Sequence, residues 1–322
     1  HQSYNKNIDI HRKAITMKQI KMGPSTLSIP AMALGIMRMD QKSVTEAVDA
    51  ISAAYEKGIN FIDSADIYGG GKSETVFGQA LKETKIGRDK LFIQSKTGIV
   101  PGKRYDFSEK YILTAVDGIL DRMQVDYLDS LVLHRPDILM DPEEVAEAFD
   151  TLQAQGKVRF FGVSNFNASE IELLKTAVTQ PIMFDQLQFG LMHTGMLDSI
   201  VHTNMTDEKS VDHDGQTWNY LLRHRITLQC WSPFQYGMFE GTFINNSKFP
   251  QLNEELEKLA EHYQVGKNAI AASWILRCPG QIQILVGSMN PQHIADSAAG
   301  SDIQLTKQEW YDLYLAAGND LP

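Results

Sequence analysis

The chain has few cysteines and fewer positive than negative charges. Only Cys230 and Cys278 occur among 322 residues, with no CxxC pair and no spacing typical of a metal site. We expect both to be small buried apolar side chains in a reducing compartment, and therefore a cytoplasmic protein. Thirty Lys and Arg against forty Asp and Glu give a formal charge of −10. That balance argues against binding to nucleic acid or to an anionic membrane surface.

Long apolar runs are also missing. No run has the length needed to span a membrane, and the N-terminal HQSYNKNIDIHRKAIT lacks the apolar core of a signal peptide. We expect residues 1–16 to be an expression tag or an added leader, disordered or extended, and residues 17–322 to form a single domain. With 43% hydrophobic and 22% charged residues, the composition is ordinary for a soluble enzyme, and the nine histidines show no metal-ligand spacing.

The chain is built from short apolar runs that alternate with amphipathic segments. Residues 17–35 predict two short strands around the turn signal at residues 23–25, the second continuing into a buried strand. Apolar strands separated by helices predict a parallel sheet covered by helices, and eight such units predict closure into a (β/α)8 TIM barrel. The further strand runs are NFIDSAD, LFIQSKTG, YLDSLVLHRP, VRFFGVSN, IMFDQLQF, ITLQCWSP and IQILVGS.

Two stretches interrupt this alternation. Residues 190–215 are polar and irregular, and FQYGMFEGTFINNSKFP is aromatic and contains glycine. Each follows a predicted strand, so we expect long loops at the C-terminal face of the barrel. Active sites of TIM barrels are built at that face.

Polar side chains stand at the ends of several predicted strands. Lys96 lies within an apolar run, and a buried ammonium needs a carboxylate partner, for which Asp63 on the neighbouring strand is the candidate. A buried ion pair that only fixes strand register is the alternative. Tyr68 and His134 favour chemistry, because a lysine beside a phenol lowers the tyrosine pKa. Such a tyrosine can donate a proton to a carbonyl oxygen, which His134 can orient.

At this point the chain resembles the aldo-keto reductases. The matching stretches, in order, are GINFIDSADIYGGGKSETVFGQAL, LFIQSKTG, YLDSLVLHRPD, GKVRFFGVSNF, the Gln186 strand, WSP and VGSMNPQHI, and the C-terminal TKQEWYDLYLAAG is similar to a bacterial branch of oxidoreductases. The resemblance implies that the protein reduces small aldehydes or ketones with NADPH by direct hydride transfer, with Tyr68 as general acid/base. The catalytic residues that it implies are Asp63, Tyr68, Lys96 and His134.

The resemblance also implies where the cofactor binds. Ser164, Asn165 and Gln186 correspond to the side chains that hydrogen-bond the nicotinamide carboxamide. Trp231 corresponds to the aromatic residue that stacks on the nicotinamide, with core filling as the alternative. The helix start after Gly287 should lie against the adenosine phosphate, where backbone N–H groups favour anions. The expected cofactor residues are Gly35, Met37, Ser164, Asn165, Gln186, Trp231, Ser232, Pro233, Phe234, Gly287, Ser288, Met289 and His293.

The sequence departs from the family pattern at two of these positions. Many members have Lys in place of Gly287 and Arg in place of His293, and both cations contact the 2′-phosphate. Ser288 and His293 can still bind that phosphate with less charge attraction, so NADPH is the expected cofactor and NADH the second candidate. The substrate mouth is expected to be apolar, or else its side chains anchor loops; its candidates are Met37, Arg38, Phe234, Tyr236, Met238 and Phe239.

Other enzyme classes lack their motifs here. The stretch at residues 69–74 lacks the last glycine of GxGxxG, residues 162–166 lack the last glycine of GxSxG, and Lys96 claims one of the carboxylates that glycoside hydrolysis would need. The alternative that stays open is a cofactor-binding redox sensor or partner-binding module with little turnover, as in the channel β-subunits. A sensor holds its cofactor tightly, whereas a reductase releases it in each cycle.

Overall fold

Eight parallel strands close into a barrel in the computed structural model, which describes residues 16–322. The strands follow one another around the ring in chain order, so the predicted (β/α)8 barrel is confirmed. The expectation for the leader falls outside the described residues, apart from Thr16. The barrel strands are β3 (Met32–Gly35), β4 (Phe61–Asp63), β5 (Phe92–Thr97), β8 (Leu128–Leu133), β9 (Val158–Ser164), β10 (Ile182–Gln188), β11 (Thr227–Trp231) and β14 (Ile282–Val286).

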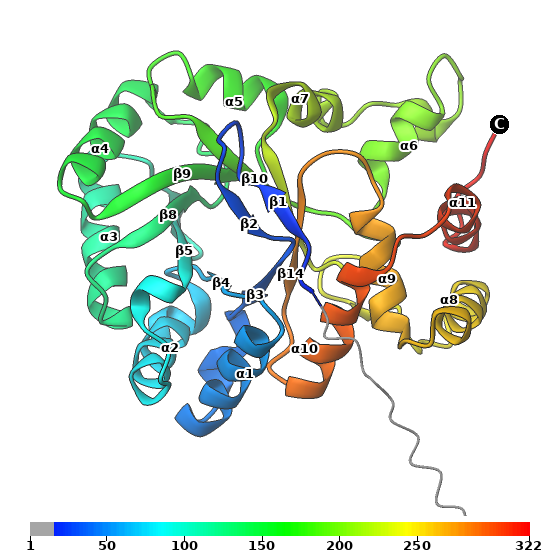
Figure 1. The fold of residues 1–322 in the computed structure, drawn as a ribbon. Helices are drawn as coiled ribbons and strands as arrows, with labels where there is room; N and C mark the ends of the chain where they lie inside the picture. Colours follow the sequence, from blue (N-terminus) through cyan, green and yellow to red (C-terminus); the bar gives the residue numbers. More distant parts are fainter. Residues whose placement is uncertain (1–15) are drawn as a thin grey trace, which may run out of the picture.

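Helices surround the barrel on its outer side (Figure 1). Local capping starts several of them; in the first, the Ser43 side chain accepts from the Glu46 N–H and the Glu46 carboxylate accepts from the Ser43 N–H. No helix within residues 16–322 is long and apolar enough to cross a membrane. The helices are α1 (Val44–Glu56), α2 (Lys72–Glu83), α3 (Glu109–Met123), α4 (Pro142–Ala154), α5 (Ala168–Leu174), α6 (Gly195–Val201), α7 (Thr217–His224), α8 (Pro250–Tyr263), α9 (Lys267–Leu276), α10 (Pro291–Ala298) and α11 (Lys307–Ala316).

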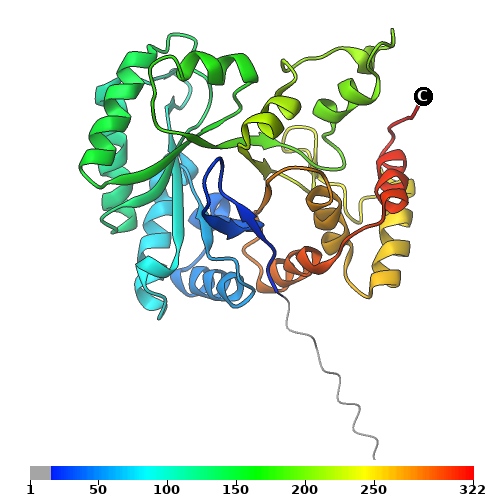
Figure 2. The ribbon, with the colours of Figure 1, turned by 45° about the horizontal axis from the view of Figure 1, so that its top comes forward.

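The predicted N-terminal hairpin is confirmed and covers the amino end of the barrel (Figure 2). Strand β1 (Gln19–Lys21) pairs antiparallel with β2 (Ser28–Pro30), and the turn N–H of Gly23 donates to Thr227 Oγ1 at 2.8 Å. Gly23 has a φ of +53°, and a Cβ there would lie 2.7 Å from Met183 Sδ. Only glycine therefore allows this turn to approach the strand starts so closely.

The stretch at residues 190–215 is more regular than expected. It contains α6, so the expectation of an irregular loop was wrong for its first part. Leu197 of this helix is buried, and Asp198 accepts a hydrogen bond from Tyr314 Oη of α11 at 2.6 Å. These two anchors hold a helix of only seven residues in place.

Two small hairpins lie at the carboxyl end of the barrel. Strands β6 (Ile99–Val100) and β7 (Arg104–Tyr105) follow β5, whereas β12 (Gln235–Tyr236) and β13 (Gly241–Thr242) follow β11. The second hairpin lies in the aromatic stretch that the sequence placed at this face. The hairpins and the loop after β10 therefore surround the end at which the polar strand residues gather.

Candidate active site

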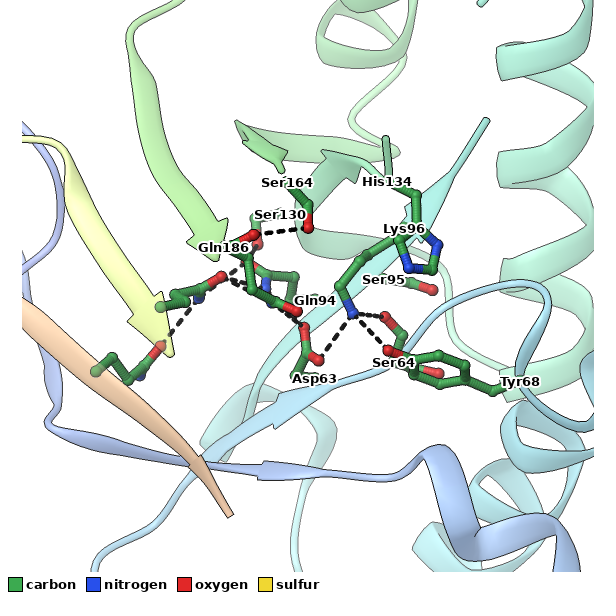
Figure 3. A network of polar contacts seen from close by, with 12 residues as sticks. Asp63, Ser64, Tyr68, Gln94, Ser95, Lys96, Ser130, His134, Ser164 and Gln186 are labelled. Carbon is green, nitrogen blue, oxygen red and sulfur yellow. Dashed lines mark hydrogen bonds and ion pairs between the residues drawn. The ribbon is translucent and has the colours of Figure 1, made fainter. Parts of the chain in front are cut away.

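Lys96 lies in the barrel interior near the end of β5 and has no exposed surface. Its ammonium donates to Asp63 Oδ2 at 2.8 Å, to the Ser64 carbonyl at 2.8 Å and to Tyr68 Oη at 3.1 Å (Figure 3). These contacts use all three N–H bonds of an ammonium. Burial is the largest single effect and lowers the pKa of Lys96, but Asp63 and Tyr68 together outweigh it, and the pKa lies above its usual value. The ammonium is therefore charged, with one N–H directed at the phenol.

Tyr68 opens a short helical turn after β4 and faces the same cavity as His134. Because Lys96 has only donors, the phenol oxygen accepts in their contact, and the phenol O–H has no acceptor among the described residues. Burial raises the pKa of Tyr68, and the attraction of Lys96, which lowers it, offsets only part of this rise. The expectation that Lys96 lowers the tyrosine pKa is confirmed for the effect of the lysine itself, but burial outweighs it and the net pKa lies above its usual value. The phenol keeps its proton at neutral pH.

His134 follows β8, with its ring 6.1 Å from the Tyr68 ring and almost perpendicular to it. Burial lowers the pKa of His134 well below its usual value, and the positive charges of Lys96 and Arg135 lower it further. Its Nδ1 is buried without a hydrogen-bond partner in the part of the chain that the structure describes. The site therefore presents a neutral imidazole beside a protonated phenol.

The other face of Asp63 is held by a layer of glutamines, of which the sequence analysis named only Gln186, as a cofactor residue (Figure 3). Asp63 Oδ1 accepts from Nε2 of Gln94 at 2.8 Å and of Gln186 at 3.0 Å. Both amides also donate to Gln229 Oε1, and Gln229 Nε2 donates to Gln283 Oε1 at 3.0 Å. Interiors of TIM barrels are usually filled by branched apolar side chains. Here a buried amide network crosses the barrel and ends on the carboxylate.

The residues expected around the nicotinamide are linked to one another and to the strand ends by hydrogen bonds. Asn165, with a φ of 59°, donates from Nδ2 to the His134 carbonyl at 3.2 Å and accepts at Oδ1 from Trp231 Nε1 at 3.1 Å. Ser164 Oγ donates to the Gln186 carbonyl at 2.9 Å. The NH2 group of Gln186 is used by Asp63 and Gln229, so only its Oε1 is available to a ligand.

One cavity of about 1050 Å³ joins the catalytic candidates to the expected cofactor residues. Asp63, Tyr68 and His134 line this cavity, whereas Lys96 is buried behind them and does not line it. Of the expected mouth residues, Tyr236 and Met238 do not line it, and that expectation was wrong for these two. All expected cofactor residues line it: Gly35, Met37, Ser164, Asn165, Gln186, Trp231, Ser232, Pro233, Phe234, Gly287, Ser288, Met289 and His293.

The backbone N–H groups at the start of α10 form hydrogen bonds within the chain. Asn290 Oδ1 accepts from the N–H of Gln292 at 2.9 Å and of His293 at 3.3 Å, and Ser288 Oγ accepts from the Asn290 N–H at 3.1 Å. Pro291 has no N–H. The N–H groups of Asn290, Gln292 and His293 are therefore hydrogen-bonded within the chain, and the expectation that backbone N–H groups here favour an anion stays a prediction for Ser288 and Met289.

Comparison with known proteins finds relatives over nearly the whole chain. The model of the aldo/keto reductase family matches residues 31–314. The chain is 31% identical to 6-dehydroglucose reductase of Novosphingobium aromaticivorans, over 94% of this chain and 96% of that protein. It is 30% identical to oxidoreductase YdhF of Escherichia coli, over 95% of this chain and all of that protein. An aldo-keto reductase from Klebsiella pneumoniae, solved in complex with NADPH, shares the fold with a TM-score of 0.74 at 24% identity, over 92% of this chain and 94% of that chain.

Proposed function

Because this chain belongs to the aldo/keto reductase family, we propose that it reduces an aldehyde or a ketone to the alcohol with NADPH. The observation that carries the proposal is the 3.1 Å contact from Lys96 Nζ to Tyr68 Oη at a cavity wall. This contact leaves the phenol proton free for a substrate oxygen. The relative from Novosphingobium aromaticivorans is also a reductase, which supports this direction of the reaction.

The cavity fits a nicotinamide dinucleotide together with a small substrate. Its volume of about 1050 Å³ lies at the upper end of ordinary ligand sites. The free Oε1 of Gln186 would accept from the carboxamide, and Trp231 would lie along the nicotinamide ring. Ser288 and His293, at the loop after β14, would lie at the adenosine end. When bound, the dihydronicotinamide supplies the hydride for the carbonyl carbon.

The proton comes from the chain itself. As the new C–H bond forms at the carbonyl carbon, Tyr68 donates its phenol proton to the oxygen, and solvent later returns a proton to Tyr68. Lys96 stabilises the phenolate that this transfer leaves, and Asp63 fixes the ammonium in place. His134, neutral because its pKa is depressed, donates a hydrogen bond to the carbonyl oxygen and orients it.

The proposal is tested with NADPH deuterated at C4 and an aromatic aldehyde such as 4-nitrobenzaldehyde. We expect loss of NADPH absorbance in step with alcohol formation, with deuterium at the carbinol carbon; the same assay with NADH measures the cofactor preference. Deuterium that exchanges with solvent would contradict direct hydride transfer. Tight NADPH binding without turnover on any of a panel of aldehydes and ketones would favour the sensor instead.

A further inference from the structure

Arg38 reaches from one side of the cavity to the other. It lies in a short helical turn (Met37–Gln41) after β3, and its Nη1 donates to the Gly287 carbonyl after β14 at 3.3 Å. The side chain lines the cavity, and Arg38 forms no ion pair with a carboxylate among residues 16–322. Glu46, in the helix that follows, pairs with Lys42 at 3.8 Å. Most of the five guanidinium donors are therefore free for a ligand.

Gly287 leaves the space that this guanidinium occupies. A Cβ at this position would lie 3.3 Å from Arg38 Nη1, tighter than ordinary van der Waals contact, and would meet no other atom within 4 Å. The φ of Gly287 is not in the left-handed region, so the backbone itself does not require glycine there. The small residue at 287 and the large cation at 38 thus fit each other.

The loop at Gly287 has little other positive charge to offer. Ser288 contributes a hydroxyl whose oxygen already accepts the Asn290 N–H, and His293 contributes an imidazole 3.5 Å from that hydroxyl. The N–H groups at the start of α10 are also bound within the chain. Three cations line the cavity, Arg38, Lys42 and Arg135, and of these only Arg38 hydrogen-bonds this loop in the part of the chain that the structure describes, so it is the one placed for an anion at this end.

We propose that Arg38 binds a phosphate group of the dinucleotide and supplies the cation that position 287 does not carry. The inference rests on the proposed function, because the dinucleotide is its cofactor. A guanidinium forms two parallel charge-assisted hydrogen bonds with a phosphate, which a single ammonium does not. Two groups have this chemistry: the 2′-phosphate, present only in NADPH, and the diphosphate, present in both NADPH and NADH.

The test measures binding to the cofactor-free protein, by calorimetry or by quenching of tryptophan fluorescence. The ligands are NADPH, NADH and 2′,5′-ADP, and the variant is Arg38→Gln. Loss of one charge-assisted contact predicts NADPH binding weaker by roughly 10- to 100-fold. A loss confined to NADPH and 2′,5′-ADP assigns Arg38 to the 2′-phosphate, and an equal loss for NADPH and NADH assigns it to the diphosphate.

Two further variants complete the design. Arg223→Gln removes the same charge from an exposed position on α7 outside the cavity and should leave NADPH affinity within about twofold. Gly287→Lys in the Arg38→Gln background returns a cation to the emptied space and should recover most of the lost affinity. Folding of each variant is checked by circular dichroism.

Either of two results would overturn the inference. One is that Arg38→Gln binds both cofactors as tightly as Arg223→Gln does. The other is that Arg223→Gln weakens NADPH binding as much as Arg38→Gln does, which would mean that the effect comes from the net charge of the protein and not from a contact of Arg38. A wild-type protein that binds neither cofactor would instead contradict the proposed function, so the two failures are distinguishable.

Discussion

Lys96 Nζ lies 2.8 Å from Asp63 Oδ2, and these side chains are 0% and 2% exposed. Removing two charges from water costs about as much as their attraction returns, so such a pair adds little net stability. Its value lies in position, because Asp63 is itself held by Gln94 and Gln186 and in turn fixes the ammonium against Tyr68. The buried pair is therefore best explained as part of the site.

Replacing Lys96 by Met should destabilise the protein strongly. The change leaves the Asp63 carboxylate buried without its counter-charge, which predicts a loss of about 3–5 kcal/mol in the free energy of unfolding. Urea denaturation followed by circular dichroism measures this. The double variant Lys96→Met/Asp63→Asn, which buries no charge, should recover a substantial part of the loss. A single variant as stable as the wild type would contradict a charged Asp63.

Replacing Tyr68 by Phe should remove most turnover and leave cofactor binding intact. General acid catalysis contributes about 10²- to 10⁴-fold, so kcat should fall within that range, because the variant lacks the phenol proton. Steady-state kinetics give kcat, and NADPH titration of the same preparation gives the affinity. An unchanged kcat would remove Tyr68 from the proton step.

Asp66 should make stability depend on pH. Burial, the largest cause, raises its pKa from 3.8 to about 6, against a hydrogen bond from Thr97 that lowers it, while Glu74 adds to the rise. Between these two pKa values the native state binds more protons than the unfolded state. The contribution of Asp66 to stability therefore falls as pH rises through this window, by up to about 3 kcal/mol.

Asp66→Asn tests this effect. At pH 7.5 the variant should be more stable than the wild type by roughly 1–3 kcal/mol, and the difference should shrink towards pH 4. Urea unfolding at several pH values measures it. Asp49→Asn, on the exposed face of α1, is the matched control and should show no such trend. Parallel stability curves for the Asp66 variant and the wild type would contradict the raised pKa.

Replacing Gln229 by Leu should destabilise the barrel although it adds an apolar side chain. Gln229 accepts from two amides and donates to Gln283 Oε1, so its loss strands buried polar groups at about 1–3 kcal/mol each. Chemical denaturation gives the loss, and Gln304→Leu, at an exposed position, is the control. A more stable Gln229 variant would mean that the amide network has no structural role.

The sequence predicted the arrangement of the site better than its electrostatics. Strand ends were predictable because parallel strands in a barrel bring their carboxyl ends together, which places Asp63, Lys96 and His134 near one another. The glutamine layer was not predicted, although the sequence carries a sign of it, since one glutamine stands in each of the apolar runs LFIQSK, ITLQC and IQILV. The net pKa of Tyr68 was not predictable, because it depends on how far burial outweighs the neighbouring lysine.

Contacts between distant segments were also out of reach. Arg38 and Gly287 are 249 residues apart in sequence. Taken alone, Arg38 suggests a residue of the substrate mouth, and Gly287 suggests that the cation found there in many family members is absent. The engaged N–H groups of α10 depend on which way the Asn290 side chain turns. Such features follow from three-dimensional packing, which periodicity and motif spacing do not encode.

The hairpin of β1 and β2 covers the amino end of the barrel, whereas the cavity lies among the carboxyl ends of the strands and the loops after them. In the proposed reaction, the alcohol leaves the cavity on the same side of the barrel from which the next aldehyde enters. Incoming and outgoing molecules therefore compete for one path.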